Sequence, residues 1–110
     1  SLLRRIYWIS DPEVQKRTWF MGMRVKTDPF EELMDGFFVT SKASMLIRNY
    51  KDFEITDDQV KKLKELYEHL ETYQEKVKGE QDLQKILDDP EWHRIQAHAK
   101  EIVILFDFKP

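Results

Sequence analysis

The 110-residue chain contains no cysteine. Disulfide bonds, thiolate metal ligands and a thiol nucleophile are therefore excluded. Glycine is also scarce, and the three glycines (Gly22, Gly36, Gly79) stand far apart, so no glycine-rich loop is present to bind phosphate. A chain without cysteine fits a reducing compartment, and we expect a cytoplasmic protein.

Long hydrophobic runs are missing as well. The longest, residues 102–106, is far shorter than the roughly 20 residues that span a bilayer, so we expect no membrane contact. Aromatic residues still make up 13% of the chain, which is enough to build a core and argues against disorder. With few turn residues and many Glu, Lys and Leu, the composition predicts one all-α domain over residues 1–110.

Helix starts are the clearest local pattern. Asp-Pro steps occur at residues 11–12, 28–29 and 89–90, and residues 56–59 (Thr-Asp-Asp-Gln) form a capping box. Apolar residues follow each start at helical spacing, as in the stripe Phe30, Leu33, Met34, Phe37. The pattern predicts a compact bundle of four to five helices, at about 12–23, 29–50 (possibly broken), 57–78, 81–87 and 90–106.

Two segments are ambiguous. Residues 6–9 (Ile-Tyr-Trp-Ile) fit either a short strand or an apolar N-terminal arm laid over the bundle. Residues 39–50 fit a further helix capped by Ser41 better than an extended segment around residues 45–47. Ser10 with Glu13 also matches a capping box for the helix predicted at 12–23.

A surplus of aromatic and charged side chains marks a candidate partner-binding face. Aromatic residues and Arg are enriched at protein interfaces, and they cluster in residues 17–24; an acidic group follows in residues 28–35. The alternative is that the first segment is a two-sided helix buried in a small core, and that the second is a solvated face. The candidate residues are Arg17, Trp19, Phe20, Arg24, Glu31, Glu32 and Asp35.

Catalytic and metal-binding patterns are lacking. His93 and His98 are five apart and lie on different helix faces, and no Glu-x-x-His motif occurs. The serines lack a Gly-x-Ser-x-Gly context, and the acidic pairs stand at helix starts, where capping explains them. We therefore expect no enzyme, no cofactor and no metal, with a ligand-binding bundle interior near Tyr67, His98 and Glu101 as a remaining alternative.

Charge is unevenly distributed. Residues 1–26 carry six basic and two acidic side chains, whereas the whole chain has a net charge of −3. The acidic total argues against binding a phosphate backbone, but the basic N-terminal segment could still do so. Nucleic-acid binding is therefore the second hypothesis, and its candidate residues are Arg4, Arg5, Lys16, Arg17, Arg24 and Lys26.

Residues 7–13 (Tyr-Trp-Ile-Ser-Asp-Pro-Glu) and 87–95 (Leu-Asp-Asp-Pro-Glu-Trp-His-Arg-Ile) resemble segments of small uncharacterised bacterial proteins. Some of these proteins are regarded as immunity partners of toxins. The resemblance implies a non-enzymatic role and transfers no site residues. The leading hypothesis is thus a protein-interaction domain, of an immunity or regulatory kind, whose partner is another protein; a homodimer is also consistent with the sequence.

Overall fold

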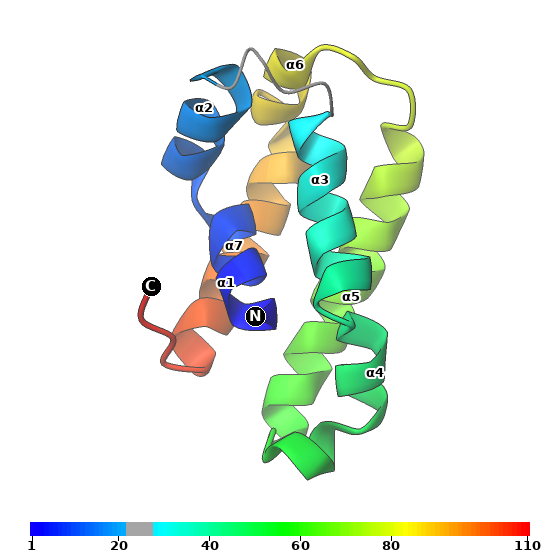
Figure 1. Ribbon diagram of the computed structural model, residues 1–110, viewed down its shortest axis with the longest axis vertical. Helices are drawn as coiled ribbons and strands as arrows, with labels where there is room; N and C mark the ends of the chain where they lie inside the picture. The colour runs from blue at the N-terminus through cyan, green and yellow to red at the C-terminus, as the bar shows by residue number, and fades with distance from the viewer. Residues whose placement is uncertain (22–27) are drawn as a thin grey trace.

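The computed structural model of the chain describes residues 1–21 and 28–110, and within these ranges all regular elements are helical (Figure 1). The predicted all-α fold is confirmed. The main helices are α1 (Leu2–Ser10), α2 (Pro12–Met21), α3 (Pro29–Asp35), α4 (Ala43–Arg48), α5 (Asp57–Lys76), α6 (Leu83–Leu87) and α7 (Pro90–Leu105). A π-helical turn, η1 (Gly36–Thr40), follows α3, and a 3₁₀ turn, η2 (Tyr50–Phe53), follows α4.

The bundle is organised around α7. This helix runs antiparallel to α5 and packs against both α5 and α1, while α3 lies beside α5 (Figure 1). The short helix α2 lies at the end of the molecule that also holds α6, and the hairpin of α4 and the start of α5 forms the other end (Figure 1). The helices predicted at 57–78, 81–87 and 90–106 are therefore confirmed to within a few residues.

All three Asp-Pro steps begin helices, as predicted. At each step the carboxylate of the aspartate (Asp11, Asp28, Asp89) accepts a hydrogen bond of 2.9 Å from the backbone N–H two residues later. The capping box predicted for Ser10 is wrong, because Asp11 takes the capping position. The Ser10 hydroxyl instead donates to the carbonyl of Tyr7 at 2.6 Å.

The N-terminal segment is a helix, not the strand or apolar arm that we expected. Leu2, Ile6 and Ile9 fall at i, i+4 and i+7 and are buried in the core. Tyr7 and Trp8 lie half-buried beside that stripe. The apolar residues 6–9 therefore cover two faces of one helix. For this reason their sequence does not show the 3.6-residue period of an amphipathic helix.

The helix predicted at 29–50 is broken, as the sequence allowed. The break lies at Lys42, which adopts a left-handed conformation with φ 54° immediately before α4. Ser41 does not cap α4, because its hydroxyl donates to the carbonyl of Gly36 at 2.7 Å. Gly36 itself permits a close approach of α1, since a Cβ there would lie 2.8 Å from Nη1 of Arg5.

An aromatic cluster joins four helices at the centre. Trp92 of α7 lies with its ring centroid 5.5 Å from Phe30, 5.6 Å from Tyr73 and 6.2 Å from Trp19. These rings come from α3, α5 and α2, respectively, and all four residues are buried. Such pairs add about 0.5–1.5 kcal/mol each beyond the area they bury.

Gln15 is the most constrained polar group in this core. Only 1% of it is exposed, yet its amide makes four hydrogen bonds. The nitrogen donates to the carbonyls of Trp8 and Ile9, at 3.0 and 2.8 Å, and the oxygen accepts from Trp92 Nε1 and Gln96 Nε2, at 2.9 and 2.7 Å. Both donors and both lone pairs of the amide are thus used, and α1, α2 and α7 are joined at one point.

We expect Gln15→Leu to lower the free energy of unfolding by about 3 kcal/mol or more, because it leaves two buried N–H donors and two buried carbonyls without a partner. The free energy is measured by urea denaturation monitored by circular dichroism. The control is Gln84→Leu, at an exposed position of α6, which should change stability by less than about 0.5 kcal/mol. Equal effects of the two substitutions would contradict a special role for Gln15.

Candidate functional site

A hollow of about 400 Å³ opens between α1, α2 and α3. Each helix contributes side chains of two kinds to its wall. The apolar surface includes Trp8, Trp19 and Leu33, and the charged groups are Arg5, Arg17 and Glu32. A concave surface with aromatic walls and a few polar groups is the usual form of a binding site.

Three of the predicted partner-binding residues meet at this hollow. Arg17 and Trp19 reach it from α2, and Glu32 reaches it from α3. Arg17 is exposed, whereas Trp19 is only 7% exposed and belongs mainly to the core. Trp19 forms the floor of the hollow because its ring packs on Phe30 and Trp92.

The other predicted residues lie elsewhere. Phe20 is 43% exposed on α2 and does not line the hollow. Glu31 and Asp35 are exposed on α3, and Glu31 lines a separate hollow beside Gly79. Arg24 lies outside the residues that the structure describes.

The sequence analysis missed the contribution of α1. Arg5 and Trp8 are one helical turn apart, and the Arg5 guanidinium lies 5.0 Å from the centre of the Trp8 ring. The sequence shows an Arg three residues before a Trp, but this spacing predicts a contact between the two side chains only if the segment is a helix. Because we expected residues 1–10 to be an arm, the pairing was not foreseen.

Two polar side chains at this hollow already have hydrogen-bond partners within the fold. Its most buried polar group, Gln15, has all its hydrogen-bonding capacity committed to α1 and α7. The Thr18 hydroxyl donates to the carbonyl of Val14 within its own helix, at 2.8 Å. The other side chains at the hollow include two indoles, two guanidinium cations and the carboxylate of Glu32, so the cations outnumber the carboxylate. Such a surface suits an apolar group with a neighbouring anion.

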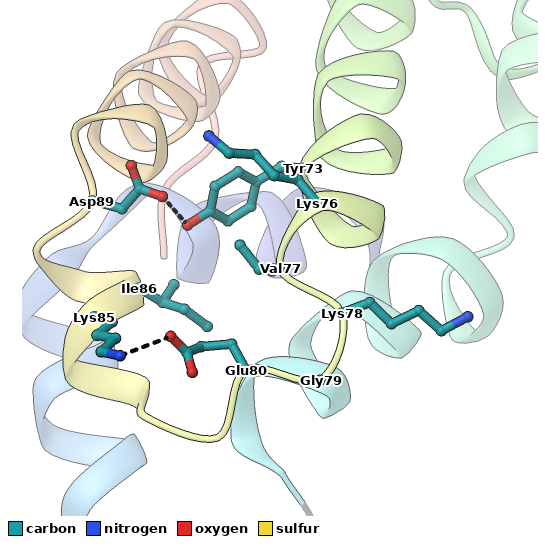
Figure 2. A pocket seen from close by; sticks show the side chains of 9 residues that line it. All are labelled: Tyr73, Lys76, Val77, Lys78, Gly79, Glu80, Lys85, Ile86 and Asp89. Atoms are coloured by element: carbon teal, nitrogen blue, oxygen red, sulfur yellow. Dashed lines mark hydrogen bonds and ion pairs between the residues drawn. The ribbon is translucent and has the colours of Figure 1, made fainter.

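A second hollow, of about 370 Å³, lies between the end of α5 and the start of α7 (Figure 2). Its inner wall carries Tyr73, whose hydroxyl donates to Oδ2 of Asp89 at 2.8 Å. Burial, and then this hydrogen bond to a carboxylate, raise the pKa of the Tyr73 hydroxyl well above its usual range. Tyr73 is thus a fixed hydrogen-bond donor at physiological pH.

Asp89 serves two partners at once. Burial favours a higher pKa for its carboxyl, but hydrogen bonds from the Glu91 N–H and the Tyr73 hydroxyl, together with the Lys76 cation, outweigh burial and lower the pKa. The other ionic groups in Figure 2 also have partners or face outward: Lys85 pairs with Glu80 at 3.8 Å, and the Lys78 side chain points away. The Asp89 carboxylate therefore caps α7 and ties it to the end of α5 through Tyr73.

A pair of histidines lies between α5 and α7. The rings of His69 and His98 are 6.3 Å apart, and each has a glutamate near its Nε2 atom: Glu91 at 3.2 Å from His69 and Glu65 at 3.8 Å from His98. Nε2 of His98 is buried and has no hydrogen bond. Burial lowers the pKa of His98, and the Glu65 carboxylate opposes this only in part.

No cluster of three or more His, Asp and Glu side chains in residues 1–21 and 28–110 has an arrangement that would hold a metal ion. At the alternative ligand site, Tyr67 packs against Phe37 and Phe38, and Nε2 of His98 lies 3.8 Å from Oε2 of Glu65. Among the described helices, none is long and apolar enough to cross a membrane.

Comparison with known proteins adds no relative. No family model matches the chain. Neither the curated proteins nor the solved structures contain a significant match to it. Function is therefore inferred from the geometry of this chain alone.

We expect Tyr73→Phe to lower the free energy of unfolding at pH 7 by about 2 kcal/mol, since it removes a hydrogen bond to a charged carboxylate. The folded-state pKa of Asp89 lies below its ordinary value of 3.8, so this stabilisation is present above pH 3.8 and is lost as the pH falls through the lowered pKa. Urea unfolding from pH 7 to pH 2 should show the two proteins converging. Tyr50→Phe, which removes an exposed bond to Asp57, is the control and should have little effect.

We expect the protein to lose stability as the pH falls below the ordinary histidine pKa of 6.5, because folded His98 takes up a proton less readily than the unfolded chain. His98→Gln removes this titration, so the variant should show a shallower loss of stability over the window just below pH 6.5. The measurement is the urea midpoint at half-unit pH steps. Parallel curves for the variant and the wild type would contradict the assignment.

Proposed function

We propose that the protein is a non-enzymatic interaction domain, of an immunity or regulatory kind, that binds another protein in the cytoplasm. The observation that supports this most is the hollow between α1, α2 and α3, where Arg17 and Trp8 are accessible above a buried Trp19. Trp, Tyr and Arg are the residues that dominate binding energy at protein interfaces.

The surroundings of the hollow support the same proposal. Phe20 is a large apolar side chain of α2 that is 43% exposed, and it lies outside the aromatic core. An exposed aromatic residue on a helix that also lines a concave aromatic surface is consistent with an interface on that helix. Glu31 and Asp35 would belong to a polar rim on α3.

Nucleic-acid binding has less support in the geometry. Lys16 pairs with Glu13 of its own helix at 3.5 Å, and the Arg5 guanidinium is held over Trp8. Lys16, Arg5 and Arg17 are therefore divided between local partners and the hollow, whereas a phosphate backbone needs several free cations on one face.

The test is affinity purification of the tagged protein from its native host, with chain-specific mass spectrometry to identify what is bound. We expect one partner that is retained by the wild type and weakened about tenfold or more by Phe20→Ser, in line with the loss of an interface aromatic residue. The affinity of the identified partner is then measured by isothermal titration calorimetry.

Phe53→Ser is the matched control. Phe53 is 48% exposed on η2, at the end of the molecule away from α2 (Figure 1), so its loss should leave the affinity unchanged. Recovery of the monomer alone at working concentration, or equal effects of the two serine substitutions, would contradict the proposed face.

A further inference from the structure

We propose that the hollow between α1, α2 and α3 binds an acidic segment of the partner protein, with one aromatic or leucine side chain inserted between Trp8 and Trp19 and an adjacent carboxylate held by Arg17. This inference rests on the proposed function and names the chemistry of the partner. It is carried by the size of the hollow, its charges and its rigidity.

Size and surface decide the inserted group. The hollow has a volume of about 400 Å³, near the lower limit of the roughly 300–1,000 Å³ that ligand pockets occupy. Its wall is formed by Trp8, Trp19, Val14 and Leu33, which present rings and methyl groups. One large apolar side chain with its flanking backbone fills such a space, and burial of that side chain contributes about 1.5–3 kcal/mol.

Charge decides what flanks the apolar group. Two guanidinium groups line the hollow from different helices, Arg5 from α1 and Arg17 from α2, against the single carboxylate of Glu32. Arg17 is exposed and has no ion-pair partner among the residues that the structure describes. A guanidinium binds a carboxylate through two parallel hydrogen bonds, so an acidic residue beside the apolar one is the complementary sequence.

Rigidity makes the site ready for binding. Gln15, which lies under the hollow, joins α2 to the carbonyls of α1 and to Trp92. Trp19 is fixed against the same Trp92 ring, and Arg5 is held between Trp8 and the bare backbone of Gly36. Because these walls are already ordered, a bound segment loses little free energy to reorganisation of the domain.

The test is selection of binders to the folded protein from a phage-displayed library of random 12-residue peptides. We expect the enriched sequences to combine Phe, Trp or Leu with a neighbouring Asp or Glu. The strongest sequence is then synthesised with a fluorescent label, and its dissociation constant is measured by fluorescence anisotropy for the wild type and the variants.

Two variants probe the two halves of the site. Arg17→Glu reverses an exposed charge, and Thr18→Trp fills the hollow from an exposed position, so neither disturbs the buried core. Each should weaken the peptide about tenfold or more, the size expected for loss of a central interface contact. Lys61→Glu is the charge-matched control, on the first turns of α5 at the far end of the molecule, and should leave the affinity unchanged (Figure 1).

The proposal is overturned if no peptide is enriched, if the enriched peptides are basic or lack an apolar residue, or if they bind Arg17→Glu as well as the wild type. In the last two cases a native partner that depends on Phe20 would still support the interaction domain, so only the chemistry assigned to the hollow would fail. Absence of both the native partner and any peptide would remove the two proposals together.

Discussion

The packing of α1, α2 and α7 depends on the four hydrogen bonds of Gln15. A neutral amide buried at this depth is tolerated only because every donor and acceptor has a partner, and those partners lie on two other helices, α1 and α7. Its bonds to the carbonyls of Trp8 and Ile9 fix α2 to the end of α1, and its bonds to Trp92 and Gln96 fix α2 to α7. A purely apolar residue at this position would leave both arrangements less specified.

The proposed binding surface is a consequence of that arrangement. Packing α2 against α1 and α3 buries Trp19 in the aromatic core and leaves a hollow between the three helices. Arg17 of α2 is exposed and lines that hollow together with Trp8 of α1. Core and surface are therefore opposite sides of one helix, which reconciles the two interpretations of residues 17–20: α2 is buried on one face and available for contact on the other.

The titratable groups fall into two classes. Asp89, Tyr73 and His98 lie at the contacts of α7, and their shifted pKa values arise from burial and from fixed neighbours inside the fold. Perturbed titration often marks an active site, but here it accompanies helix capping and helix packing. Arg17 differs from these groups because the fold gives it no partner among the described residues, and this is the physical ground for assigning it a role in binding.

The sequence alone determined the features that depend on neighbours within a few residues. The three aspartate caps and the helix bounded by residues 57 and 76 follow from turn chemistry and from apolar spacing, which act along the chain. The tertiary structure decided the rest: that residues 2–10 form a helix, that Gln15 is buried, and that α1 supplies one wall of the hollow. These features need contacts between residues up to 81 positions apart, such as that of Gln15 with Gln96, and no local pattern encodes such a distance.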